Sequence, residues 1–257
     1  MTGRVAWISL TPVKALAIET VDEVEVLEHG LRGDRRFFLV DENGRLVNNK
    51  GRRSALQLVH ATYDEPDNLL TIRFADGAVV SGHPEAAEEL TTSFHRRPFR
   101  ARRTPGPWDD AISDVIAERV QLVAPEAAAP DRGREGATTL LSTGSLRELA
   151  GRLDVDAVDA RRFRMSFGID GPGAHEEDRW IGRRVRVGEA VVVPRGNVGR
   201  CAITTQNPDT GRADLDTLKA LAAYRGDMAA TEPLPFGVHA AVAEPGRVRV
   251  GDPVELL

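Results

Sequence analysis

The stretch VGRCAITTQNPDTG, at residues 198–211, contains the one cysteine of this 257-residue chain. Arg200 directly precedes Cys201, and a guanidinium beside a thiol favours the thiolate, which is the form that attacks electrophiles and binds metals. The alternative is that Cys201 lies buried and behaves as a small apolar side chain. Further along, Pro208 stands where the first central residue of a turn is expected. The stretch therefore predicts a strand that carries the cysteine, followed by a tight turn.

The composition of the whole chain excludes several classes of protein. One cysteine rules out an internal disulfide framework, and also any iron–sulfur or zinc site built from four cysteines of this chain. A formal net charge of −5 argues against a general nucleic-acid binder, which needs a basic face. Neither a secretory signal nor an apolar run long enough to cross a membrane is visible. We therefore expect a soluble, cytoplasmic protein that binds neither nucleic acid nor membrane.

The first hundred residues consist mainly of short runs rich in β-branched and aromatic residues, separated by turn signals. The runs are RVAWISL (4–10), VDEVEVL (21–27), RRFFLVD (35–41), ALQLVHATYD (55–64) and LLTIRFADG (69–77). Their close spacing predicts a barrel or a sandwich. A short helix is expected at HPEAAEELTTSF (83–94), and the Arg- and Pro-rich stretch at 96–108 is the best position for a domain boundary.

The second half mixes helices and strands. Residues 109–123 predict a helix that leads into a strand, and in LLSTGSLRELAGRLDVD (140–156) the leucines at 146, 149 and 153 fall on one helical face. Ser145 and Glu148 have the spacing of a capping box at the start of that helix. The remaining expectations are a hairpin at 183–194, a helix at 214–226 and one or two strands at 247–257.

The run ARRFRMSFGID (160–170) alternates with period 2, which predicts one strand with Arg164 and Ser166 on its polar face. A guanidinium fork beside a hydroxyl suits an anion, phosphate above all, although a strand face exposed only to solvent is the alternative. Thr204 and Thr205 are either ligand donors or ordinary β-formers. The chain contains neither a Gly-rich phosphate loop nor a nucleophile elbow.

Taken in order, several pieces of the chain resemble the MOSC family, named for the C-terminal domain of molybdenum-cofactor sulfurase. The pieces are LLSTGSLRELAGRL (140–153), ARRFRMSFGID (160–170), EEDRWIGRRVRVG (176–188), GRCAITTQNPDTG (199–211), LPFGV (234–238) and RVRVGDPVELL (247–257). The first half, through ISLTPVKAL (8–16) and HGLRGDRRFFLVDENGRLV (29–47), is similar to the N-terminal β-barrel domain associated with this family. The resemblance implies a mostly β, α+β fold with few short helices: an N-terminal β-rich domain at 1–105 and a MOSC β-barrel at 106–257.

Within the family, the two-domain layout most resembles the branch that contains the amidoxime-reducing components of mitochondria and their bacterial relatives. That resemblance implies a molybdenum–pterin cofactor, and an enzyme that reduces N-hydroxylated small molecules. Because a single cysteine cannot build an iron–sulfur cluster, the electrons would come from a separate donor protein, such as a ferredoxin, a flavoprotein or a haem protein.

The resemblance also implies roles for individual residues. Cys201 would be the catalytic residue and the thiolate ligand of the metal. The cofactor would be held by cations and by supporting donors, namely Lys14, Arg35, Arg164 and Arg200, and Ser142, Ser166, Thr204 and Thr205. The chain departs from the family pattern at Ala15, where a serine is common, and at Ser166, which replaces a longer amide. The segment PRGNVGRC (194–201) is also unusual.

Two other functions are compatible with the sequence. Cys201 could carry a persulfide and act as a sulfur carrier or transferase, with a separate desulfurase as its source of sulfur. Alternatively, the protein could bind the molybdenum cofactor without turnover. An oxidoreductase is the function that we expect.

Overall fold

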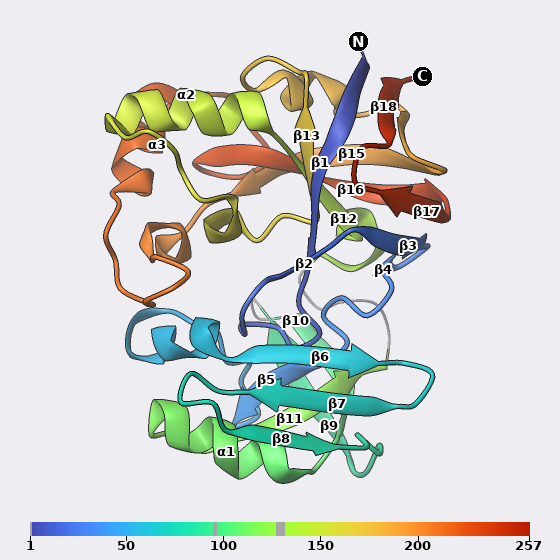
Figure 1. Cartoon of the computed structure of the whole chain (residues 1–257), viewed down its shortest axis with the longest axis vertical. Coiled ribbons are helices and arrows are strands. Elements are labelled where there is room, and N and C mark those ends of the chain that lie inside the picture. The colour runs from blue at the N-terminus through green and yellow to red at the C-terminus, as the bar shows by residue number, and fades with distance from the viewer. Residues whose placement is uncertain (1, 95–96, 127–131) are drawn as a thin grey trace.

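The computed structural model describes residues 2–94, 97–126 and 132–257 (Figure 1). Two β-rich bodies lie one above the other, and the blue strand β1 belongs to the upper body, at the top of the view. No helix in the described ranges is both long and apolar enough to span a bilayer.

The upper body is a barrel, and within the described residues seven strands close it. Going round the barrel, they are β1 (Thr2–Leu10), β13 (Phe167–Asp170), β12 (Thr138–Ser142), β16 (Pro235–Glu244), β15 (Ala190–Gly199), β14 (Val185–Val187) and β18 (Pro253–Leu256), which pairs with β1. Buried side chains from every side fill the interior, among them Ile8, Phe167, Val187 and Val238. The expectation of a mostly β, α+β fold with a β-barrel is confirmed.

A small sheet covers one side of this barrel. Its strands are β17 (Gly246–Arg249), β3 (Glu23–Leu27) and β4 (Gly30–Leu31), while β2 (Glu19–Val21) pairs with the end of β1. The alternation in EVEVL turns Val24 and Val26 inward while the glutamates stay exposed. These two valines join the core of the barrel, so residues from the first half of the chain help to fill it.

The lower body contains two sheets and a helix. One sheet has the order β5 (Phe38–Asp41), β11 (Val120–Pro125), β10 (Arg97–Arg103), β9 (Glu89–Phe94), and the other has the order β6 (His60–Asp64), β7 (Leu69–Arg73), β8 (Val79–Gly82). Between them, α1 (Pro107–Ile116) buries Trp108 completely, and the indole Nε1 donates to the carbonyl of Thr104 at 2.8 Å. The expected helix followed by a strand at 109–123 is confirmed by α1 and β11.

Two helices, α2 (Thr143–Leu153) and α3 (Thr217–Arg225), pack together beside the barrel (Figure 1). Both were expected, but the cap of α2 lies three residues earlier than the capping box predicted. Ser142 is the N-cap, and its hydroxyl accepts the backbone N–H of Ser145 at 3.0 Å. Glu148 instead pairs with Arg152 one turn later.

Three local expectations were wrong. Residues 83–94 form no helix, because Glu89–Phe94 pairs along its whole length with β10 and this pairing outweighs the helix propensity of the alanines and glutamates. Residues 160–170 are not one strand, because Ala160–Phe163 forms a 3-10 helix and Arg164 has a left-handed backbone before β13 begins. Cys201 is not in a strand, because β15 ends at Gly199.

The boundary between residues 105 and 106 stays a prediction. Strand pairing links the two halves of the chain in both bodies. In the barrel, β1 pairs with β13 and β18, while in the lower body β11 pairs with β5 and β10.

Candidate functional site

A cavity lies where the loops after β1 and β4 meet the loops at the end of β15 and before β13. Seven of the nine residues that the sequence singles out line this cavity: Lys14, Arg35, Arg164, Ser166, Arg200, Cys201 and Thr204. They come from three regions of the chain, at 14–35, 164–166 and 200–204, and the fold brings them together.

Two of the nine residues do not line the cavity. Ser142 is fully buried as the N-cap of α2, where its hydroxyl contacts Ser145 and the carbonyl of Gly173. The Thr205 hydroxyl donates to the carbonyl of Ala202 at 2.8 Å, inside a single turn. Both hydroxyls satisfy backbone groups of their own neighbourhood.

The loop after β1 carries Lys14 and the loop after β4 carries Arg35. The Lys14 N–H donates to the carbonyl of Phe37 at 2.8 Å, and the Arg35 N–H donates to the carbonyl of Thr11 at 2.7 Å. Arg35 also forms an ion pair with Asp34, and its Nη2 donates to the carbonyl of Arg164 at 3.1 Å. The last of these bonds joins Arg35 of the first half of the chain to the second half.

The turn before β13 places Arg164 and Ser166. Arg164 has φ +55°, so its side chain leaves a sharp turn, and its Nη2 donates to the carbonyl of Leu16 at 2.8 Å. Ser166 is 2% exposed and its N–H donates to the Thr139 hydroxyl at 2.7 Å. The turn therefore presents a cation to the cavity and keeps the serine within the wall.

Arg200 is held by neutral acceptors. Its Nε donates to the carbonyl of Phe236 and its Nη1 to the carbonyl of Phe163, each at 2.9 Å, while the guanidinium carbon lies 5.3 Å from the centre of the Phe163 ring. In the described part of the chain it forms no ion pair with a carboxylate. Burial lowers the pKa of Arg200 to about 9.

Cys201 follows Arg200 as the cap of the short 3-10 helix Ala202–Thr205. Its carbonyl accepts the Thr204 N–H and the Thr204 hydroxyl, both at 3.1 Å. Cys201 is exposed, which contradicts the alternative that it lies buried as a small apolar side chain. The Thr204 hydroxyl also contacts the Thr217 hydroxyl at 2.7 Å, which ties this turn to α3.

Sequence reasoning missed further residues of the wall, including Asn48, Asn49, Arg132 and Arg162. Asn49 is 1% exposed, and among the described residues its Nδ2 finds no hydrogen-bond partner, which is uncommon for a buried amide. Arg162 pairs with Asp214 at 2.7 Å. Arg132 pairs with Glu232. Asn48 and Asn49 belong to none of the motifs considered in the sequence, and arginines are too abundant in this chain for one of them to stand out.

Cationic side chains outnumber carboxylates in the cavity wall, although three of its arginines already form ion pairs. Six cationic side chains line it, from Lys14, Arg35, Arg132, Arg162, Arg164 and Arg200, whereas Asp34 is the one carboxylate among its lining residues. Such a wall attracts an anion, and the exposed thiol at Cys201 adds one soft ligand.

Family models match almost the entire chain. The model of the MOSC domain matches residues 128–255, and that of the MOSC N-terminal beta barrel domain matches residues 2–120. The chain belongs to the MOSC family.

Curated relatives of this MOSC protein include two whose alignment spans nearly all of it. The mitochondrial amidoxime reducing component 2 of Rattus norvegicus is 34% identical over 287 residues, covering 98% of this chain and 82% of the relative. The mitochondrial amidoxime-reducing component 1 of Mus musculus is 27% identical over 285 residues, covering 99% and 82%. The molybdenum cofactor sulfurase of Oryza sativa subsp. japonica is 33% identical over 101 residues, covering 35% of this chain and 12% of the relative.

Proposed function

We propose that this MOSC protein binds a molybdenum–pterin cofactor in the cationic cavity and reduces N-hydroxylated small molecules. The observation that carries the proposal is the pairing of Arg200, a partly buried cation whose hydrogen bonds within the described residues all go to neutral acceptors, with the exposed thiol of Cys201. A buried charge normally has a partner. An anionic, thiophilic group in the cavity would provide one for Arg200 and would also take Cys201 as a ligand.

The residues present fit such a cofactor. The pterin part carries a phosphate and two sulfur atoms that bind the metal, so it needs directed cations, which Lys14, Arg35 and Arg164 would supply. The buried Nδ2 of Asn49, which has no partner, would donate to an acceptor of the pterin ring after a small adjustment of the wall. When bound, the cofactor would supply the two-electron redox chemistry.

The protein's own groups would orient the cofactor and the substrate. Cys201 would bind the metal, and the guanidinium of the preceding residue, Arg200, would stabilise the negative charge of the thiolate. Arg35 and Arg164, which touch each other across the two bodies, would keep the phosphate end closed. Ser166 would position the wall through Thr139 rather than contact the ligand first.

The remaining parts of the proposal rest on the relatives. Those with the longest alignments are named for amidoxime reduction, and this is why the proposed substrates are amidoximes, hydroxylamines and similar N-hydroxylated compounds. We propose that the electrons come from a separate donor protein, such as a ferredoxin, flavoprotein or haem protein, and that the enzyme acts in the cytoplasm.

Metal and pterin analysis tests the proposal. The wild-type protein and Cys201→Ala, both produced in a host that makes the cofactor, are compared for molybdenum and for released pterin. We expect about one of each per wild-type chain, with the metal lost in the variant. Turnover of benzamidoxime with a chemical electron donor then tests the reaction. A wild-type protein with neither metal nor pterin would overturn the proposal.

Sulfur transfer is the alternative, and the exposure of Cys201 favours it as a second candidate because a persulfide carrier needs an accessible thiol. Mass spectrometry of the protein incubated with a cysteine desulfurase would show a gain of one sulfur atom on Cys201. A persulfide in the absence of molybdenum supports this function, whereas molybdenum with no persulfide excludes it.

A further inference from the structure

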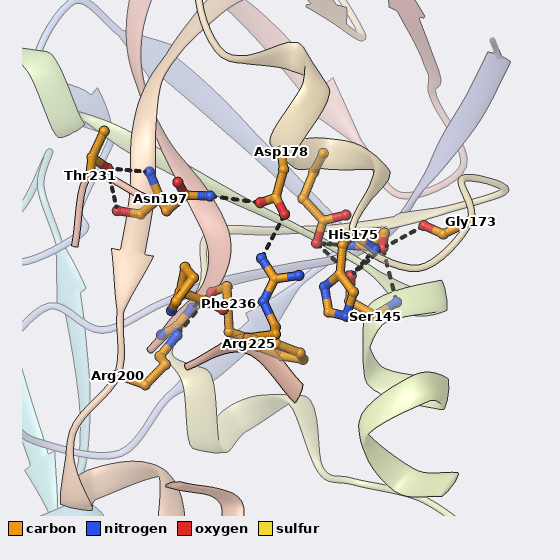
Figure 2. Close-up of polar contacts among 12 residues, drawn as sticks. Ser145, Gly173, His175, Asp178, Asn197, Arg200, Arg225, Thr231 and Phe236 are labelled. Carbon is orange, nitrogen blue, oxygen red and sulfur yellow. Dashed lines mark hydrogen bonds and ion pairs between the residues drawn. The ribbon is translucent and has the colours of Figure 1, made fainter. Parts of the chain in front are cut away.

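Behind the cavity wall, Arg225 at the end of α3 connects two other elements. The residue is 6% exposed. Its Nε donates to the carbonyl of Pro235 at 2.7 Å, and its Nη2 donates to the Asp178 carboxylate at 2.6 Å (Figure 2). A guanidinium is a rigid, planar fork, so these two bonds fix the start of β16 relative to the 3-10 helix Glu176–Trp180.

The other carboxylate oxygen of Asp178 fixes β15. It accepts the Nδ2 of Asn197 at 2.7 Å, and Asn197 is 3% exposed. The Asn197 N–H in turn donates to the Thr231 hydroxyl at 2.7 Å. Asn197 lies three residues before Arg200 on the same stretch of chain, so the bonds from Arg225 through Asp178 reach the segment that ends in the cysteine (Figure 2).

The second route from Arg225 to Arg200 runs through the start of β16. Arg225 bonds the carbonyl of Pro235, and Arg200 bonds the next carbonyl, that of Phe236, through both Nε and Nη2. The Arg200 N–H also donates to the carbonyl of Leu234 at 3.2 Å. Figure 2 shows the two arginines on either side of Phe236.

This stretch has a left-handed backbone at both ends, and that conformation is strained at the leucine. Leu234 has φ +50° and Gly237 has φ +79°, both in the left-handed region, which a leucine rarely adopts. A Cβ at Gly237 would stand 2.8 Å from the carbonyl oxygen of Leu140, so the close approach requires a glycine. Such strain persists only where surrounding contacts hold it, and it concentrates at functional sites.

We propose that Arg225 and Asp178 are positioning residues for the cofactor site: together they hold the Leu234–Gly237 carbonyls at which Arg200 is aimed, and so set Arg200 and Cys201 at the cavity. That these residues serve a cofactor site rests on the proposed function, whereas the contacts that hold Arg200 in place are present without a cofactor. If residue 225 served only as the partner of an ion pair, its positive charge would be enough. Positioning requires the guanidinium itself, which bonds the carbonyl of Pro235 and Asp178 at the same time. A lysine keeps the charge beside Asp178 and loses the bidentate grip.

The test compares Arg225→Lys with the wild-type protein in two ways. In the cofactor-free protein, NMR follows hydrogen exchange of the Arg200 Nε–H, whose signal is assigned by its loss in Arg200→Lys. We expect exchange about tenfold faster in Arg225→Lys at temperatures well below its Tm. In protein from a cofactor-producing host, pterin per chain falls about tenfold, the lower end of what loss of a group supporting a metal ligand costs.

The matched control is Arg119→Lys, whose arginine forms an exposed pair with Asp110 and should leave both readouts unchanged. Unchanged Arg200 exchange and pterin content in Arg225→Lys, with a lower Tm alone, would overturn the inference. If Arg225→Lys fails to fold, Asp178→Asn is measured in the same way, since its single amide oxygen can serve only one of the two donors. A wild-type protein without pterin would refute the proposed function, and the exchange measurement would still decide the inference.

Discussion

Arg200 and Arg225 bond consecutive carbonyls of one strand, yet their surroundings differ. Arg225 has a carboxylate partner in Asp178, and this pair is complete without any ligand. Arg200 has carbonyls, a thioether and aromatic rings around it, and it faces the cavity. The comparison separates an arginine with a carboxylate partner from one that, within the described residues, bonds only neutral groups.

The largest effect is expected when Arg225 loses its carboxylate partner, Asp178. Asp178→Ala leaves Arg225 buried without a counter-charge, and such an uncompensated charge costs about 3–5 kcal/mol. Urea unfolding followed by circular dichroism measures this loss. Stability within about 1 kcal/mol of wild type would mean that the pair is worth no more than an exposed one.

Cys201→Ser tests the cavity side of the comparison. The exposed thiol packs against little, so we expect stability close to wild type. Reductase activity should fall by more than about 100-fold, beyond the upper end for loss of a partner that only supports a metal ligand. Initial rates with benzamidoxime measure the change, with Thr205→Ser as a matched variant outside the cavity. Full activity in Cys201→Ser would contradict the assignment of the metal ligand.

Arg164→Ala has a smaller expected effect, because several other cations remain around the ligand. We expect pterin content to fall by about tenfold, which corresponds to one charge-assisted contact of about 1.4 kcal/mol. Fluorescence of the oxidised pterin released from equal amounts of protein measures it. Arg212→Ala, on the exposed turn after Thr210, provides a comparison outside the cavity. Equal pterin in Arg164→Ala and wild type would show that this arginine does not hold the cofactor.

At neutral pH the smallest effect is that of His175, which lies near Arg225 and influences stability only in acid. Burial lowers its pKa from 6.5 to about 4, with Arg225 also contributing. The pKa of His175 is lower in the folded than in the unfolded state. Between pH 6.5 and 4 the unfolded chain therefore takes up a proton that the folded protein does not, and the free energy of unfolding falls as the pH falls through this range. In His175→Asn, which tolerates the left-handed backbone there, the free energy of unfolding should fall less steeply over this range. Parallel pH profiles for the two proteins would contradict this.

The sequence predicted the fold class well, because alternation and turn residues are local signals. It failed where long-range contacts decide. Glu89–Phe94 is a strand only because β10 lies beside it, and Ala160–Phe163 turns into a 3-10 helix where side-chain alternation alone suggests a strand. The alternation nevertheless predicts correctly that Phe163 points inward, because its ring is buried in the 3-10 helix as it would have been in a strand.

For the candidate site, too, the sequence indicates the residues that stand in recognisable local patterns and not those that depend on long-range contacts. The polar residues within the recognisable pieces, such as Lys14, Arg164 and Arg200, were found. Ser142 is the N-cap of α2 and does not line the cavity, a placement that the sequence does not reveal because a helix cap and a ligand donor are the same kind of residue. Asn49 and Arg132 were missed because their importance comes from burial and from neighbours far along the chain, neither of which a single sequence displays.

The pairing of β1 has a consequence for the way the molecule is made. This nine-residue strand lies between β13 and β18, so its partners are at Phe167–Asp170 and Pro253–Leu256. During synthesis at about 5–20 residues per second, the ribosome must add some 250 residues before β18 emerges and the ring of strands can close. Until then one edge of β1 lacks its β18 partner, so the growing chain depends on the lower body, complete much earlier, for its first stable structure.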